Sequence, residues 1–293
     1  MPELPAAGFV PVDKPAGPTS HDVVAMARRA LRQRRIGHTG TLDPFASGLL
    51  LLAIGRATRL AEYLSDLPKS YSAVMRLGQT TDTDDRAGQV VTRTDDWRQL
   101  EPETIRDALA SMAGVIRQVP PMYSARKVGG RRLYAIAREG RQVERAATEV
   151  TVHSLEVRRI EGPDVAFEIT CSTGTYIRSI ARDIGSDLGV GAHLLELRRT
   201  AIGPHRVEDA VTLDRLDDFD AVRQVWVSPA RALAHLPAID IDDDETTALV
   251  QGRSIAVPPE MGAGTTAALG HGELVAIGDV QAGSLRPRKV LVG

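Results

Sequence analysis

The sequence predicts a mixed α+β protein with a small β-rich part at its C-terminal end. In some segments apolar residues recur at three- and four-residue spacing, which is typical of helices, and in others they alternate with polar residues, which is typical of half-buried strands. The 293 residues are 43% hydrophobic and 25% charged. This composition is typical of a globular chain and excludes fibrous classes and disorder of the whole chain.

Helices are expected where apolar side chains gather on one face between capping residues. Ser20 would cap the first of them, and Gly189 would end a later one that directly follows a strand. The predicted helices, in chain order, are 20–34, a segment that ends near 64, 102–112, 176–188 and 193–199.

Strands are expected where β-branched or alternating apolar residues lie between turn-forming residues. The predicted strands, in chain order, are 8–12, 71–77, 89–92, 165–171, 274–280 and 290–292. Turn-rich segments at 36–48 and 80–88 would be loops, and an apolar run follows the first of them. We expect a large domain of residues 1–235 and a small β-rich domain of residues 236–293.

The charges are separated along the chain, although 36 Lys and Arg nearly balance 38 Asp and Glu. Residues 121–145 contain seven basic and two acidic side chains, and residues 28–35 contain five Arg. Residues 208–245 contain eleven acidic side chains against three Arg. Because salt screens each charge over about 8 Å, local basic blocks determine whether a polyanion can bind. The basic blocks are compatible with a polyanion partner and equally with solvated helix faces.

Neither a membrane span nor a secretory leader is expected. No apolar run approaches the roughly 20 residues that a spanning helix needs, and the N-terminus lacks a charged start followed by a long apolar stretch. Cys171 is the single cysteine, so the chain can form no internal disulfide. These features predict a protein of the reducing cytoplasm.

Several common kinds of active site are excluded by the motifs. The glycine-rich segment 36–48 has the spacing of neither a P-loop nor a dinucleotide-binding turn. No HExxH or GxSxG motif occurs, and the seven His do not cluster with acidic residues at metal-ligand spacing. We therefore expect no nucleotide cofactor, no metal ion and no serine nucleophile.

Asp43 is the carboxylate that the sequence singles out. It lies in an Asp-Pro turn among glycines, where it could be structural or could act as a nucleophile or base. A carboxylate that a substrate covers needs a cation beside it to stay ionised. Arg178, near the start of a predicted helix, is a candidate, although it could also be a surface residue, because Arg182 lies on the same face one turn later.

The segment GHTGTLDPFASGLL (37–50) resembles the aspartate-containing motif of the TruB family of pseudouridine synthases. Five further segments resemble the successive motifs of that family, in the same order: 12–24, 69–85, 120–140, 171–185 and 191–203. The resemblance implies the pseudouridine synthase fold, in which helices surround a largely antiparallel sheet with a central cleft. It also implies that the C-terminal domain is PUA-like.

The resemblance also implies roles for individual residues. Asp43 matches the essential aspartate, Tyr71 the active-site tyrosine, and Arg178 the arginine that pairs with the carboxylate. Leu197 matches an apolar wall, and His38 a histidine that fills the space left by flipped bases. Two other residues, Lys14 and Tyr176, are supporting matches. Ala201 and His205 depart from the family pattern, which affects expected RNA contacts rather than the expected chemistry.

The activity that the resemblance implies is isomerisation of the T-loop uridine (position 55) of tRNA to pseudouridine, with no cofactor. The basic segment 121–150 would clamp the RNA through Arg126, Lys127, Arg131 and Arg132. The tRNA T-arm would be the partner of a monomer that needs no other protein. Asp43 would either attack the ribose or assist formation of a glycal, and the sequence does not choose between these routes.

Three other functions stay open at this point. A guide-dependent synthase for rRNA would share the motifs, but the absence of long basic tails argues against it. A noncatalytic protein that binds RNA or helps tRNA to fold would not need Asp43, Tyr71 and Arg178 together. A glycosidase would need a second carboxylate, which no motif supplies.

Overall fold

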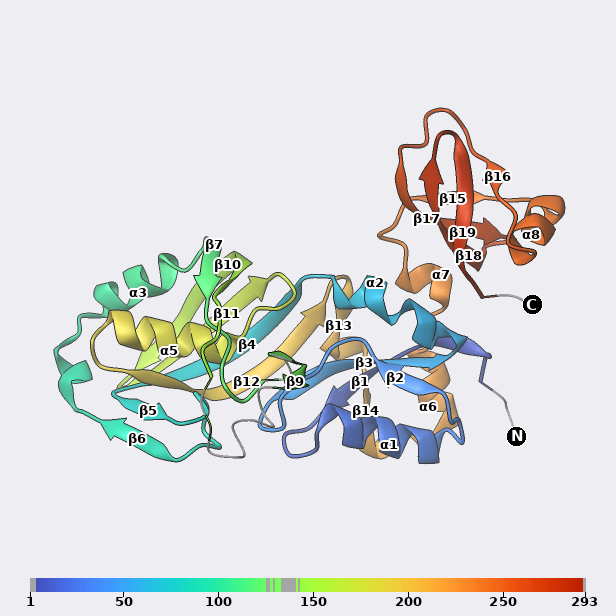
Figure 1. The fold of residues 1–293 in the computed structure, drawn as a ribbon. Helices are drawn as coiled ribbons and strands as arrows, with labels where there is room; N and C mark the ends of the chain where they lie inside the picture. Colours follow the sequence, from blue (N-terminus) through green and yellow to red (C-terminus); the bar gives the residue numbers. More distant parts are fainter. Residues whose placement is uncertain (1–3, 125–126, 129, 133–140, 142, 292–293) are drawn as a thin grey trace.

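The structure is a computed structural model that describes residues 4–124, 127–128, 130–132, 141 and 143–291 (Figure 1). Most of its strands belong to one large mixed sheet. The strands of this sheet are β1 (Ala7–Lys14), β2 (Ile36–His38), β3 (Ser47–Gly55), β4 (Lys69–Leu77), β7 (Gly114–Gln118), β10 (Thr148–Glu161), β11 (Asp164–Cys171), β12 (Ala192–Ile202), β13 (His205–Arg206) and β14 (Val211–Thr212).

These ten strands form two halves that meet at β12. Eight of them follow the order β14-β1-β3-β12-β4-β11-β10-β7, with β2 paired to β3 and β13 paired to β12. Neighbouring strands are antiparallel except at β1–β14 and at β12–β3. The β12–β3 contact consists of two register pairs, Arg198 with Ser47 and Arg199 with Gly48, whereas β12 pairs with β4 along nearly its whole length. We call the β12–β3 contact the seam.

Each half of the sheet has its own helices (Figure 1), and a separate apolar core is centred on each half. The core on the β4 side contains apolar side chains from β4, β11, α3 and α5, and another core joins β1 and β3 to α1 and α6. The helices, including short 3-10 turns labelled η, are α1 (Ser20–Ala30), η1 (Arg56–Leu60), α2 (Ala61–Ser65), η2 (Asp96–Gln99), α3 (Pro102–Ala110), α5 (Ile177–Asp187), η3 (Val207–Asp209), η4 (Leu213–Arg215), α6 (Phe219–Gln224), α7 (Pro229–Ala232) and α8 (Asp243–Val250).

A second, smaller sheet forms the β-rich C-terminal domain. Its strands, in spatial order, are β15 (Ala238–Asp240), β17 (Gly264–Gly270), β18 (Glu273–Gln281), β19 (Ser284–Val290) and β16 (Ile255–Ala256). Apolar residues of β17 and β18 share a buried core with β1, β3 and α7. The guanidinium groups of Arg56 and Arg59 donate to the carbonyl oxygens of Leu291 and Val290 at 2.8 and 2.7 Å, and Lys289 pairs with Glu62. The domain is therefore anchored on the N-terminal half of the large sheet.

Two short hairpins complete the strands of the described residues. One is formed by β5 (Gln79–Thr81) and β6 (Val90–Arg93), and the other by β8 (Lys127–Val128) and β9 (Arg131–Arg132). Among the described residues, no helix combines the length and the apolar character needed to cross a bilayer.

Most predicted elements are confirmed with small shifts at their ends, including the strand at 165–171 and the helix at 102–112. The first helix begins at Ser20, as expected, but Ser20 is not its cap and the helix ends earlier. Its N-cap is Thr19, which forms a capping box with Asp22, whereas the Ser20 hydroxyl bonds to the backbone of Leu42. It stops at Ala30 because Arg32 has a positive φ of 51°, which a right-handed helix cannot accommodate.

The predicted helix at 193–199 is wrong, because this segment lies within strand β12. Its apolar residues satisfy helical spacing over a short window, but in the structure the strand pairs with β4 along one edge and with β3 along the other. Pairing in the middle of a sheet outweighs the weak local helix preference of such a short segment. Strands β7 and β10, which flank the basic segment, were not predicted.

Candidate active site

A cavity of about 960 Å³ lies over the seam between the two halves of the large sheet. Its wall includes six of the residues singled out by the sequence: His38, Asp43, Tyr71, Tyr176, Arg178 and Leu197. These residues come from five places in the chain, which are strand β2, the loop between β2 and β3, strand β4, the start of α5, and strand β12. The fold therefore brings together residues that are up to about 160 positions apart in the sequence.

Asp43 and Arg178 form an ion pair in the wall of this cavity. The Arg178 Nε lies 2.9 Å from Oδ2 of Asp43; the arginine side chain is 4% exposed and the aspartate side chain 32% exposed. The same guanidinium lies 3.5 Å from Oδ2 of Asp85 and donates to the carbonyl oxygens of Thr83 at 3.0 Å and Tyr123 at 2.8 Å. Arg178 is thus fixed from several sides, while the Asp43 carboxylate keeps an open face toward the cavity.

The Asp-Pro turn itself holds Asp43 in place. The Ala46 N–H donates to the Asp43 carbonyl at 3.1 Å, and the Gly17 N–H donates to the Pro44 carbonyl at 2.8 Å. Lys14 Nζ also lies 3.5 Å from the Pro44 carbonyl oxygen. The Asp-Pro segment therefore forms the expected turn, and this turn presents the Asp43 carboxylate to the cavity.

Lys14 lies behind the wall rather than in it. Its side chain is fully buried and donates to the carbonyl oxygens of Pro15 and Pro18 at 2.8 and 3.0 Å. Burial lowers the pKa of Lys14 from its ordinary value of 10.5 to about 8, while the nearby Asp43 carboxylate acts in the opposite direction. This lysine supports the backbone on which Asp43 is carried.

Tyr71 and Leu197 form the buried apolar part of the wall, with 9% and 8% of their surface exposed. Burial raises the pKa of the Tyr71 phenol, and the neighbouring Arg199 guanidinium partly offsets this rise. The phenol therefore stays neutral over the physiological pH range. A planar neutral ring beside an apolar side chain suits a flat, uncharged heterocycle.

His38 and Tyr176 lie at other parts of the wall. Burial, together with His21 and Arg199, lowers the pKa of His38 from 6.5 to about 4, so its ring is neutral near pH 7. The rings of His38 and His21 meet edge to face, with centroids 5.4 Å apart. Tyr176 caps α5, and its backbone exchanges two hydrogen bonds with the side-chain amide of Gln118, at 2.8 and 3.0 Å.

Three residues of the site were missed by the sequence analysis: Lys69, Asp85 and Arg199. Lys69 and Arg199 line the cavity, and Asp85 is buried beside Arg178. Arg199 was missed because a helix was predicted at 193–199, and a helix places Leu197 and Arg199 on different faces. In a strand, residues two apart share one face, so a strand prediction would have directed attention to Arg199.

The basic segment is only partly described. Arg126 lies outside the described residues, and so do the side chains of Lys127 and Arg132, although their backbones pair in the β8–β9 hairpin. Arg131 is exposed. Near the end of the segment, Arg145 donates to the Pro120 carbonyl at 3.0 Å. A clamp for RNA at this position stays a prediction.

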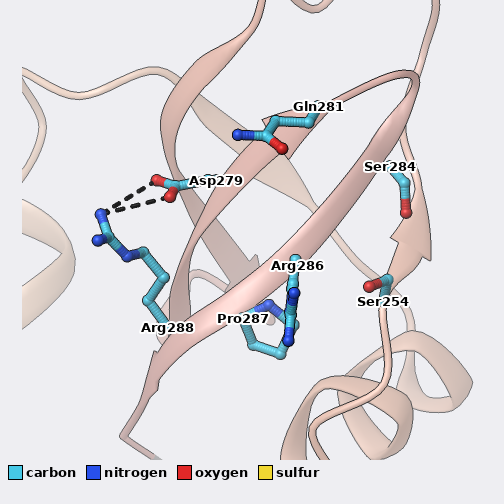
Figure 2. Close-up of a pocket in the computed structure, with 7 residues that line it drawn as sticks. All are labelled: Ser254, Asp279, Gln281, Ser284, Arg286, Pro287 and Arg288. Carbon is cyan, nitrogen blue, oxygen red and sulfur yellow. Dashed lines mark hydrogen bonds and ion pairs between the residues drawn. The ribbon is translucent and has the colours of Figure 1, made fainter.

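Polar side chains also line a groove of about 450 Å³ in the C-terminal domain (Figure 2). In it, Arg288 pairs with Asp279, and Arg286 and Ser254 also line the groove. No group of three or more His, Cys, Asp or Glu side chains suited to a metal ion occurs among the residues that the structure describes.

Two family models match the chain in succession. The N-terminal domain model of the TruB family of pseudouridylate synthases matches residues 28–177, and the C-terminal domain model of tRNA pseudouridylate synthase B matches residues 178–229. The chain belongs to the TruB family. The first match contains Asp43 and Tyr71, and the second begins at Arg178, so the two matches together contain the residues of the ion pair.

The similarity to other TruB family proteins extends over nearly the whole chain. The chain is 45% identical to the tRNA pseudouridine synthase B of Geobacter sulfurreducens, with 94% of each chain covered. It is also 45% identical to that of Thermobifida fusca, with 98% of this chain and 99% of the relative covered.

Solved structures with the same fold are also similar in sequence. A chain in the crystal structure of the archaeal box H/ACA sRNP Nop10–Cbf5 complex is 30% identical, with a TM-score of 0.74 over 97% of this chain and 86% of that chain. A chain in a Cbf5–Nop10–Gar1 complex is 32% identical, with a TM-score of 0.76 over 97% and 84%. The pseudouridine synthase fold with a β-rich C-terminal domain, expected from the sequence, is confirmed.

Proposed function

We propose that this protein is a tRNA pseudouridine synthase that isomerises the T-loop uridine. The observation that carries the proposal is the ion pair between Asp43 and the buried Arg178, which lies in a cavity wall beside Tyr71 and Leu197. The names of the TruB family relatives, tRNA pseudouridine synthase B, support tRNA as the substrate.

The reaction moves one bond of a nucleoside. The bond from ribose C1′ to uracil N1 breaks, the base turns, C1′ joins C5, and the C5 proton leaves while N1 gains a proton. No atom is lost overall and no electron is exchanged with a cofactor. Asp43 would start the reaction either by attacking C1′ or by assisting loss of a ribose proton to give a glycal.

The other residues of the wall would support this chemistry. Arg178 would keep the Asp43 carboxylate ionised when the substrate excludes water, because an adjacent cation stabilises the charged form. Tyr71 would stack on the uracil and take part in removal of the C5 proton. Leu197 would exclude water, so that the detached base rejoins the sugar instead of escaping.

Access to the uridine requires the base to leave its stack, which costs a few kcal/mol that contacts with the RNA must offset. We expect these contacts from the basic segment 121–150 and from the arginines at 28–35, with the T-arm recognised mainly by its shape. His38 would occupy space vacated by flipped bases. Within this proposal the chain acts as a monomer without a protein partner, residues 1–235 carry catalysis, and residues 236–293 form a PUA-like module.

The test is release of tritium from an unmodified tRNA transcript that carries [5-³H]uridine, in the presence of EDTA and without guide RNA. We expect release by the wild-type protein and none by Asp43→Asn. The control variant Asp107→Asn replaces an exposed aspartate on α3 and should keep full activity. A transcript in which cytidine replaces the target uridine should release no more tritium than a sample without protein.

The outcomes separate the alternative functions. Salt-sensitive tRNA binding without tritium release would favour a noncatalytic RNA-binding protein or a guide-dependent enzyme. Release by Asp43→Asn at the wild-type rate would contradict the assignment of the carboxylate. Because phosphate contacts dominate binding, Asp43→Asn should bind tRNA within about tenfold of wild type.

A further inference from the structure

Arg199 is the largest side chain that the described residues bury completely, and it lies at the seam of the large sheet. Its register partners are Gly48 in β3 and Tyr71 in β4. A Cβ atom on Gly48 would lie 2.2 Å from the Arg199 carbonyl oxygen, so β12 approaches β3 this closely only because residue 48 is glycine. Arg199 thus stands where the two halves of the sheet meet.

The guanidinium of Arg199 donates hydrogen bonds to the backbone of β3 and of the loop that carries Asp43. Its Nε donates to the Leu49 carbonyl at 2.7 Å, and its two terminal nitrogens donate to the carbonyl oxygens of Thr41 at 3.3 Å and Gly40 at 3.1 Å. Gly40 and Thr41 immediately precede the Leu42–Asp43 pair in the sequence. One rigid planar fork therefore ties β3 and the loop that carries Asp43 to strand β12.

Arg199 and Arg178 differ in how their positive charges are paired. Arg178 pairs with Asp43 and Asp85, whereas no described carboxylate forms an ion pair with Arg199, whose guanidinium donates to three carbonyl oxygens and also interacts with the Tyr71 side chain. The uncompensated charge acts on its neighbours and contributes to the lowered pKa values of Lys14, Lys69 and His38. A buried cation without a counter-ion costs stability, and an apolar residue of similar size would avoid that cost.

We propose that Arg199 is a positioning residue of the isomerase: it fixes the Asp43 loop relative to Tyr71, so that both side chains face one uridine. The inference rests on the proposed function, in which Asp43 acts at the ribose and Tyr71 faces the uracil. Both groups must keep their separation while the base turns. Misplacement of a reacting group by about 1 Å can lower the rate about 100-fold.

The experiment compares Arg199→Lys with the matched control Arg198→Lys in the tritium-release assay. Arg198 is the preceding residue of the same strand, and it forms an ion pair with Asp13 at 2.7 Å with 42% of its side chain exposed. For Arg199→Lys we expect kcat to fall about 100-fold with KM for tRNA within about threefold, because a single ammonium cannot bind three carbonyls. For Arg198→Lys both constants should stay within about threefold, because the pair it loses is partly exposed.

A second arm separates positioning from loss of folding. Arg199→Ala leaves a space of the shape of a guanidinium group, and added guanidinium ion at millimolar concentration should raise its kcat at least tenfold, whereas Arg198→Ala should not respond. Circular dichroism checks that each variant is folded, and if Arg199→Ala does not fold, the lysine pair decides. Near-wild-type kcat for Arg199→Lys, or an equal loss in Arg198→Lys, would overturn the assignment. Absence of tritium release by the wild-type protein would instead count against the proposed function itself.

Discussion

The arginines of the cavity and those of the C-terminal groove have opposite environments. Arg178 and Arg199 are almost completely buried, and their contacts lie within the protein. In the groove, the Arg288 side chain is 60% exposed and pairs with Asp279, and the Arg286 side chain is exposed and forms no hydrogen bond or ion pair with any described residue (Figure 2). Buried arginines fix the geometry of neighbouring groups, whereas exposed ones contribute little to stability and present charge to solvent.

The largest effect is expected where a buried arginine contacts the carboxylate directly. Arg178→Lys keeps the charge but cannot hold Asp43, the Thr83 carbonyl and the Tyr123 carbonyl at once, so we expect kcat to fall about 1000-fold. Single-turnover measurements with excess protein would give this value. The control is Arg182→Lys, one turn further along α5, and an equal loss there would show that any arginine on this helix face matters equally.

A glycine at the seam and a glycine in the C-terminal domain should also differ in how much an alanine substitution destabilises the protein. Gly48 has a φ of 104°, and an added Cβ would contact the Arg199 backbone at 2.2 Å. We expect Gly48→Ala to lower the free energy of unfolding by about 3 kcal/mol. Gly283, in the β18–β19 turn, has a φ of 72° but open space around it, so Gly283→Ala should cost only about 1 kcal/mol. Urea denaturation would measure both, and equal costs would contradict close approach at the seam.

The pH dependence of stability should reveal the buried histidine of the cavity. The folded protein protonates His38 only near pH 4, whereas the unfolded chain does so near 6.5. The unfolded state therefore binds more protons between these values, and stability that is fully present above pH 6.5 is lost as the pH falls toward 4. We expect His38→Asn to reduce this loss by about 2 kcal/mol in urea titrations at pH 7.5 and 4.5. The control His271→Asn replaces a histidine of the C-terminal domain that is 85% exposed and should leave the loss unchanged.

The smallest effect is expected for an exposed arginine of the groove. If RNA touches the C-terminal domain, Arg286→Ala should raise KM for tRNA about threefold, leave kcat unchanged, and reduce the slope of log affinity against log salt by about one. Filter binding at several salt concentrations would measure the slope. An unchanged slope would mean that Arg286 only interacts with solvent. A lower kcat would contradict the idea that the arginines of the groove affect binding alone, whereas those of the cavity affect catalysis.

The motifs of the sequence predicted six of the side chains that meet in the cavity, but not Lys69 or Arg199. Asp43 and Arg178 carry local signals in an Asp-Pro turn and at a helix start, whereas Tyr71 is indicated only by the family resemblance, and the fold brings these places together. Arg199 and Asp85 carry no such signal, because their importance comes from pairing between strands and from burial, which are properties of the whole sheet. The helix predicted at 193–199 failed for the same reason, since partners far away in sequence determine the conformation of β12.

The seam divides the residues of the proposed active site between the two halves of the large sheet. Asp43 follows β2 in the half of the sheet that contains β3, whereas Tyr71, Arg178 and Leu197 belong to the half that contains β4. Only two register pairs join β12 to β3, so separation at the seam is a local opening that leaves most backbone hydrogen bonds intact, although it parts Leu42 and Ala46 from the core on the β4 side. The proposed turnover therefore requires the two halves to stay in contact. As the urea concentration rises, turnover should disappear before the circular dichroism signal changes.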